Sequence, residues 1–108
     1  MNKLLLTLGL LASQSAMAIE WTEARLVDNI QIDGTGGVYY FKSMEGWGAP
    51  GCPKAAFIFY RKHQVPASEG MLSVILASQA TNRPIKARGV CTDSHHFQLE
   101  YIVQERAR

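Results

Sequence analysis

The apolar residues in the first half of the chain predict three strands, the first from a spacing of two and the other two from runs of apolar and aromatic side chains. Residues 22–33 alternate with one interruption and predict a first strand. The glycine-rich stretch 33–37 predicts a turn, because glycine adopts the positive φ that tight hairpins need. Residues 38–43, VYYFKS, are rich in β-branched and aromatic side chains and predict a second strand. Residues 55–61, AAFIFYR, are apolar on both faces and predict a third strand near the sheet centre.

The spacing then changes to that of a helix, which we expect over residues 68–81. Ser68 is placed to cap its start, and Asn82 and Pro84 are placed to end it, since asparagine tolerates the left-handed conformation and proline cannot continue a helix. The residues that recur at helical spacing are Met71, Leu72, Ile75, Leu76 and Gln79.

Alternation returns in two later stretches, which predict a fourth and a fifth strand. In residues 85–90, Lys86 and Arg88 share one face, so this strand has a solvent-facing side. Residues 97–105 form the fifth strand, and Ile102 breaks its pattern. The residues expected on its inner face are Phe97, Leu99, Tyr101 and Val103.

The resulting order is three strands, a helix and two strands, which makes the protein mainly β with one helix. This order is the layout of the OB-fold, a five-stranded Greek-key barrel. A closed barrel also removes the exposed edges that apolar strands would otherwise present. The alternative is an open antiparallel sheet with one helix packed across it.

The N-terminus has the features of a signal peptide covering residues 1–18. Lys3 gives it a positive start, residues 4–12 are apolar, and it ends in Ala-Met-Ala, which fits the small-x-small pattern of signal peptidase sites. The apolar run is shorter than the roughly 20 residues that span a bilayer. Residues 19–108 are then a single exported domain, periplasmic or secreted, and a retained N-terminal anchor is the alternative.

Composition removes several classes of partner. Without the signal peptide the chain has ten basic and nine acidic side chains, a balance that gives no reason to expect nucleic acid or a charged membrane surface. After signal cleavage no further segment is long and apolar enough to span a membrane. We expect no cofactor.

The two cysteines, Cys52 and Cys91, both lie in the exported part. An even number of cysteines in a small exported domain predicts a disulfide, and two free thiols are the alternative. In the chain-entropy model, closing a loop of this length stabilises the fold by about 4 kcal/mol. A domain this small has a modest core, so the disulfide is a large part of its stability.

The stretch RGVCTDSHHF contains side chains that bind metals or catalyse reactions elsewhere. If Cys91 is in a disulfide, Asp93, His95 and His96 remain. Neighbouring strand residues point to opposite faces, so the two histidines are poorly placed for one metal, and a zinc site needs at least three converging ligands. We therefore expect a solvated turn with a polar strand start and no metal, and we expect no enzyme, since no catalytic motif is present.

Aromatic and basic residues are the better candidates for binding. Trp47 lies in a glycine-rich loop, where an exposed ring can stack on a sugar or anchor an interface; the alternative is that it folds back over the core. Tyr39 and Tyr60 are expected to be half-buried on the sheet, and Arg88 to lie on its wet face. These four residues are the candidate ligand-binding set.

Several short motifs resemble a group of small exported proteobacterial proteins of unknown function. They are the mature start Glu20-Trp21-Thr22, the GVYYF strand, the stretch MLSVILASQATNRPIKARGVC and the closing EYIV. The group is distantly similar to the OB-fold B subunits of subtilase cytotoxin, typhoid toxin and pertussis toxin. The resemblance implies an OB barrel, a tendency to form rings lined by the helix, and glycan recognition. Only the scaffold carries over to matching positions, namely Cys52, Cys91 and the helix.

Two functions therefore remain open from the sequence. The first is an exported binding module that recognises a glycan or another protein, as a monomer or a homo-oligomer. The second is a structural or accessory envelope protein, such as an inhibitor or assembly factor, without a small-molecule ligand.

Overall fold

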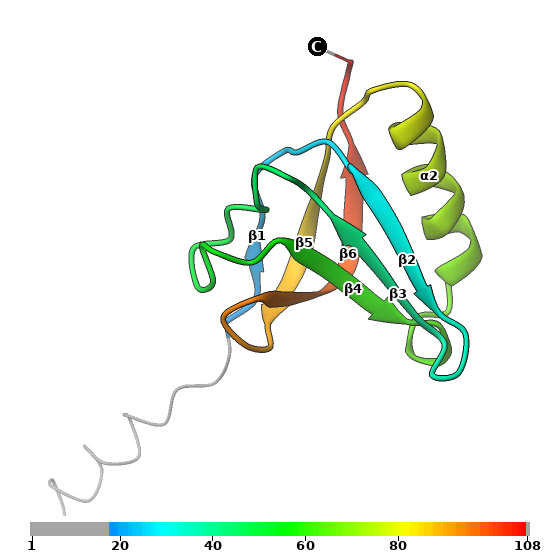
Figure 1. The fold of residues 1–108 in the computed structure, drawn as a ribbon, viewed down its shortest axis with the longest axis horizontal. Coiled ribbons are helices and arrows are strands. Elements are labelled where there is room, and N and C mark those ends of the chain that lie inside the picture. Colours follow the sequence, from blue (N-terminus) through cyan, green and yellow to red (C-terminus); the bar gives the residue numbers. More distant parts are fainter. Residues whose placement is uncertain (1–17, 108) are drawn as a thin grey trace, which may run out of the picture.

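The computed structural model describes residues 18–107, which form a six-stranded sheet with one α-helix (Figure 1). The elements are β1 (Glu20–Trp21), β2 (Asn29–Asp33), β3 (Val38–Lys42), β4 (Phe57–Arg61), the 3-10 turn η1 (Lys62–Gln64), α2 (Ser68–Ala80), β5 (Ile85–Cys91) and β6 (His96–Gln104). The protein is mainly β with one helix, as predicted. Apart from Ala18, the expected signal peptide lies outside the described residues.

The sheet has the order β1-β5-β6-β4-β3-β2 and is open, with β1 and β2 at its edges. The predicted five-stranded closed barrel is not confirmed, and the open antiparallel alternative is right only in part, because β4 and β6 pair in parallel. The expected first strand, residues 22–33, is wrong in its first half. One chain segment supplies both edge strands: β1 pairs with β5, β2 pairs with β3, and the residues between them touch the sheet at the isolated Arg25–Ile85 bridge.

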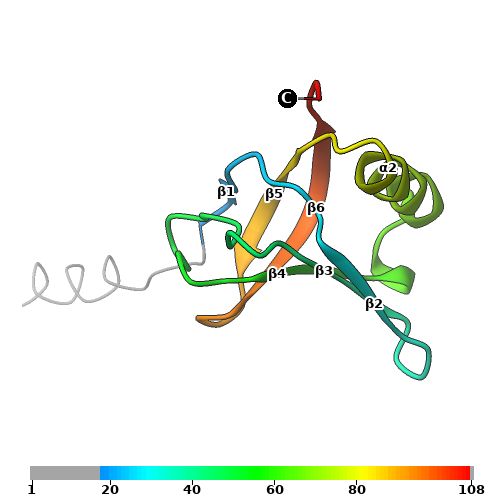
Figure 2. The same cartoon turned by 45° about the horizontal axis from the view of Figure 1, so that its top comes forward.

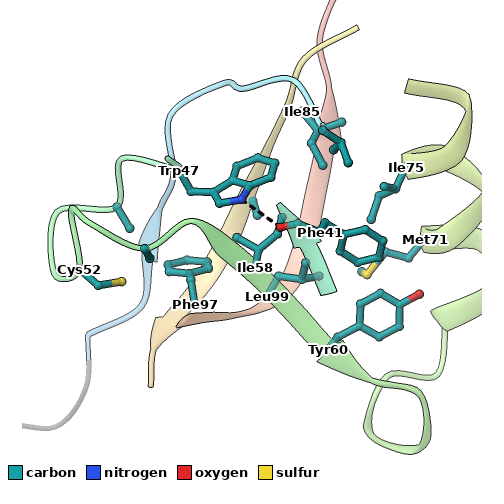
Figure 3. Close-up of a cluster of buried hydrophobic side chains, with 14 residues drawn as sticks. Phe41, Trp47, Cys52, Ile58, Tyr60, Met71, Ile75, Ile85, Phe97 and Leu99 are labelled. Carbon is teal, nitrogen blue, oxygen red and sulfur yellow. Dashed lines mark hydrogen bonds between the residues drawn. The ribbon is translucent and has the colours of Figure 1, made fainter. Parts of the chain in front are cut away.

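The inner face of the sheet and one side of α2 enclose a single hydrophobic core (Figure 3). β4 lies between β3 and β6 and contributes Ile58 and Tyr60, and α2 contributes Met71 and Ile75. Figures 1 and 2 show α2 and β1 on opposite sides of the β5–β6 pair. The further core residues labelled in Figure 3 are Phe41, Trp47, Cys52, Ile85, Phe97 and Leu99. The central position predicted for the third strand is therefore correct.

The helix occupies the predicted residues but begins differently. Ser68 does not cap it; the N-cap residue is Ala67, which makes no side-chain capping bond. Ser68 is instead buried inside the first turn, and its carbonyl oxygen accepts a hydrogen bond from Tyr60. The helix ends as expected, with Asn82 in the left-handed region at φ 55°.

The β5–β6 pair contains a register shift that the alternation pattern did not predict. Gly89 pairs with Leu99 and Arg88 pairs with Tyr101, so one residue of β6 is skipped. A side chain at Gly89 would collide with the carbonyl oxygen of Gln98, which explains why glycine is needed there. The shift turns Tyr101 outward, contrary to the expectation above.

The predicted disulfide is present between Cys52 and Cys91, whose Cα atoms are 5.9 Å apart. It joins the loop before β4 to the last residue of β5. A disulfide is compatible with a protein that works outside the reducing cytoplasm. Within residues 18–107, no helix has both the length and the apolar composition needed to cross a membrane.

Candidate binding site on the outer face of the sheet

Four aromatic rings gather on the outer face of β3, β4 and β6, opposite the core. They come from Tyr40, Phe57, Phe59 and His96, and we call them the aromatic face. Strand register brings them together: Tyr40 is paired with Phe59, and Phe57 is paired with His96 across the parallel β4–β6 ladder. Because every second residue of a strand points to the same side, these rings share one surface while Ile58 and Tyr60 point into the core.

The rings contact one another closely enough to hold a fixed arrangement. The centroid of Tyr40 lies 5.8 Å from that of Phe59, 6.2 Å from that of Phe57 and 6.3 Å from that of His96. The imidazole of His96 stacks on Phe57 at 5.8 Å with an interplanar angle of 17°. Such pairs contribute about 0.5–1.5 kcal/mol beyond the area they bury, so the surface is ordered before any ligand arrives.

Two shallow hollows lie on this surface and share Tyr40 and His96. The larger has a volume of about 320 Å³, and the second has a volume of about 230 Å³. The larger is lined by Tyr40, Phe59, Arg61, Thr92, Asp93 and His96, and the second by Gln31, Tyr40, Phe57 and His96. Aromatic walls with a few polar groups at the rim are typical of sites for small ligands.

Two cations frame the aromatic face. The Nζ of Lys42 lies 5.7 Å from the centre of the Phe57 ring, and the guanidinium of Arg61 lies 5.4 Å from the Phe59 ring. At these distances a cation is attracted to the ring face. Lys42 is paired with Phe57 at the start of β4, and Arg61 is the last residue of β4, so hydrogen-bond donors lie at both ends of the ring cluster.

The β5–β6 loop supplies an acceptor, Asp93, which lines the larger hollow together with Arg61. Asp93 Oδ1 accepts a hydrogen bond from the backbone N–H of His95 at 2.7 Å and lies 3.0 Å from His96 Nδ1. The backbone N–H of His95, and then the hydrogen bond with His96, lower the pKa of Asp93, so this carboxylate is ionised at neutral pH. Since Nδ1 faces Asp93, Nε2 is the nitrogen of His96 that a ligand can use.

The candidate set from the sequence is not brought together. Trp47 is fully buried, and its Nε1 donates a hydrogen bond to the carbonyl oxygen of Phe41 at 3.1 Å (Figure 3). The structure therefore places Trp47 in the core, the alternative that the sequence left open. Tyr60 is also fully buried, and its hydroxyl donates to the carbonyl oxygen of Ser68 at 2.9 Å.

The other two members of the set lie apart from each other. Tyr39 is half-buried on the inner face, where its ring packs 5.2 Å from that of Tyr60. Arg88 does lie on the outer face, but between Trp21 and Tyr101 rather than beside the aromatic face. Trp47 and Tyr60 are therefore core residues, and of the two tyrosines expected to be half-buried only Tyr39 is half-buried.

Sequence reasoning missed the aromatic face, although a signal for it was present. The apolar residues on both sides of β4 were interpreted as burial on both sides; on the outer side Phe59 is indeed buried, but Phe57 is only half-buried. His96 was assigned to the polar strand start after a solvated turn, and β6 does begin there, but the stacking of its ring on Phe57 was not foreseen. Aromatic residues at alternate positions of two central strands, next to a loop with Asp93, would have indicated the surface.

One group of potential metal ligands converges within residues 18–107, at Glu20, Cys52 and Cys91. Both sulfur atoms belong to the disulfide, so they are not available as thiolate ligands. The Glu20 carboxylate accepts a hydrogen bond from the backbone N–H of Gly51 at 2.6 Å. This cluster therefore fastens β1 to the disulfide loop.

Comparison of the chain with models of known protein families, with curated proteins and with solved structures finds no significant match in any of the three.

Proposed function

We propose that the protein is an exported binding module that recognises a glycan through the aromatic face. The observation that carries this proposal is the ring cluster around the two hollows that share Tyr40 and His96, with Asp93 and Arg61 at the rim. The C–H faces of a sugar ring stack on aromatic side chains, while its hydroxyl groups need donors and acceptors at the edges. The aromatic face and its rim provide both kinds of contact.

We also propose that the fold is of the OB type, with an interrupted first strand that leaves the sheet open between β1 and β2. Residues 20–33 pair with β5 at their start and with β3 at their end, which is what the first strand of such a barrel does. With the interrupted strand counted as the first, α2 lies between the third strand, β4, and the fourth, β5, which agrees with that layout. In OB-folds, the face formed by strands two and three and the loop between strands four and five bind oligosaccharides and oligonucleotides. Tyr40, Phe59 and Asp93 occupy these positions.

A glycan array followed by calorimetry tests the proposed function. The protein is exported with its own N-terminal segment, purified in the oxidised form and applied to the array. Binding of any glycan found there should weaken more than tenfold in Tyr40→Ala and in His96→Ala, which corresponds to about 1.4 kcal/mol or more. Tyr101→Ala removes a tyrosine from another part of the same outer face and should leave the affinity unchanged.

Two results would contradict the proposal of glycan binding at the aromatic face. An array without a bound glycan, or a Tyr40→Ala variant that binds as tightly as the wild type, would favour an accessory envelope protein without a small ligand. Light-scattering mass of the same sample decides between a monomer and the homo-oligomer that the resemblance implies.

A further inference from the structure

A second cluster on the outer face lies at the β1 end of the sheet and is not used by the proposed glycan site. It consists of Trp21, Lys86, Arg88, Glu100 and Tyr101, and we call it the arginine patch. Trp21 is 38% exposed and Tyr101 is 48% exposed, which is high for large aromatic side chains. Their rings meet edge to face, with centroids 5.7 Å apart.

Strand register and the β5–β6 bulge create this patch. Trp21 is paired with Arg88, and Arg88 is paired with Tyr101, so the three side chains form one row across β1, β5 and β6. Without the register shift, Tyr101 would point into the core with Phe97 and Leu99. Bulges often redirect a side chain at functional sites, and here the bulge exposes an aromatic ring beside an arginine.

The row holds the guanidinium of Arg88 in place. Its Cζ lies 4.6 Å from the centre of the Tyr101 ring and 5.8 Å from the centre of the Trp21 ring. Lys86 Nζ lies 5.1 Å from the Trp21 ring, so two cations flank one indole. A guanidinium that is already oriented loses little further freedom when it binds a carboxylate in a forked geometry.

The patch has an excess of positive charge. Glu100 accepts a hydrogen bond from Arg88 Nε at 3.3 Å, which leaves the other guanidinium nitrogens and Lys86 for a ligand. Both side chains of this ion pair are well exposed, so the pair is weak and an incoming carboxylate can compete with it. The charge and the exposed rings together fit an acidic group next to an apolar one.

We propose that the arginine patch is a docking surface for an acidic segment of a partner protein. Tryptophan, tyrosine and arginine are the residues that contribute most binding energy at protein interfaces, and all three stand in one row here. A carboxylate of the partner pairs with Arg88 and Lys86, and a neighbouring apolar side chain covers Trp21. The surface is separate from the aromatic face, since His96 and Tyr101 are roughly 15 Å apart along β6.

Selection from a phage-displayed library of random peptides tests this inference on the oxidised protein. Selection against the wild type, with counter-selection on Arg88→Ala, should enrich peptides that carry Asp or Glu beside an apolar residue. A synthetic peptide of the enriched sequence should bind at least tenfold more weakly to Arg88→Ala and to Trp21→Ala. Arg88→Lys should retain only part of the affinity, because lysine keeps the positive charge but cannot bind a carboxylate through two parallel hydrogen bonds. Lys62→Ala, an exposed cation elsewhere, should bind like the wild type.

The glycan proposal and the docking proposal can be tested separately. Tyr40→Ala should leave peptide binding unchanged, and Arg88→Ala should leave glycan binding unchanged. Enriched peptides without acidic residues, equal binding to Arg88→Ala, or no enrichment would overturn the docking proposal. Loss of binding to acidic glycans in Arg88→Ala would overturn it too, in favour of a sugar ligand at the patch. Thermal unfolding of each variant shows whether an effect reflects the surface or the fold.

Discussion

Two aromatic side chains in the core carry a polar atom, and each polar atom has a hydrogen-bond partner. Trp47 donates to the carbonyl oxygen of Phe41, and Tyr60 donates to that of Ser68. A buried donor without a partner costs about 1–3 kcal/mol, so these two bonds are what allow a tryptophan and a tyrosine to fill the core.

Replacement of Trp47 should greatly lower the stability of the fold. Trp47→Ala removes a fully buried indole, and we expect the free energy of unfolding to fall by about 3–5 kcal/mol. Urea denaturation followed by circular dichroism measures this loss. Trp21→Ala, which removes a partly exposed indole, should cost much less. Equal losses in the two variants would contradict the placement of Trp47 in the core.

The second side chain makes stability depend on pH under alkaline conditions. Burial, with a smaller contribution from Tyr39, raises the pKa of Tyr60 from 10.0 to about 12. The folded state therefore favours the protonated phenol, and this contribution is complete below pH 10 and is lost as the pH rises from 10 toward 12. Tyr60→Phe should lower stability at pH 8 by about 1 kcal/mol through the lost hydrogen bond. The difference in unfolding free energy between Tyr60→Phe and the wild type should shrink above pH 10. A difference that does not change with pH would contradict the raised pKa of Tyr60.

For single residues, the sequence indicates which are apolar but not which side of a strand faces solvent. Tyr39 and Tyr40 are neighbours of the same type, yet the first packs on the core and the second belongs to the aromatic face. Only the position of the helix separates the two sides. The helix packs on the side of Phe41 and Tyr60, and that choice is made by tertiary packing.

Among the elements, the β5–β6 pair has the strongest effect on the outer surface. Its register shift brings Ile102 against the core and Tyr101 out to solvent. The broken alternation at Ile102 was visible in the sequence. It could not be assigned to a bulge, because a bulge depends on how closely the partner strand approaches at Gly89.

A side chain at that glycine should disturb the pair. In Gly89→Ala the added Cβ meets backbone atoms of Gln98 and Leu99, so one strand must move. We expect a loss of about 2 kcal/mol or more, within the range for overpacked sites. Gly70→Ala is the matched control: its Cβ meets nothing within 4 Å in the helix, and the change should stabilise by about 0.5–1 kcal/mol. Urea unfolding of both variants measures the difference, and equal stability of Gly89→Ala and wild type would contradict the close approach.

Segments that form one element were predicted well, and the segment that forms two was not. The helix and the strands β3, β4, β5 and β6 were expected within two residues of their observed bounds, because each is one continuous run of helical or strand-forming residues. The segment before residue 33 pairs with two different strands and crosses the core between them, so no single period describes it. The same reason explains why five strands were expected and six were found.

For the whole molecule, the disulfide connects the core to the proposed glycan-binding surface. Cys91 ends β5, and the next two residues, Thr92 and Asp93, form one wall of the larger hollow. The bond therefore holds the base of the loop that presents Asp93.

Reduction should consequently affect both stability and binding. In the chain-entropy model, opening the loop of 39 residues costs about 4 kcal/mol of stability. We expect urea unfolding with and without dithiothreitol to differ by about this amount, and the reduced protein to lose affinity for any glycan found on the array. The Cys52→Ala/Cys91→Ala variant should behave like the reduced protein whether or not the reagent is present. An unchanged free energy of unfolding after complete reduction would contradict this role.

The chain segment that supplies both sheet edges also sets the order in which the protein can assemble. β1, at the start of the described chain, pairs with residues of β5 near the opposite end. A chain that emerges with its N-terminus first therefore has no partner for β1 until almost all of it has emerged. Contacts between residues so distant in sequence form slowly, because a long loop must close first. With this connectivity, the edge pairing of β1 with β5 should be among the last contacts to form as the chain is synthesised.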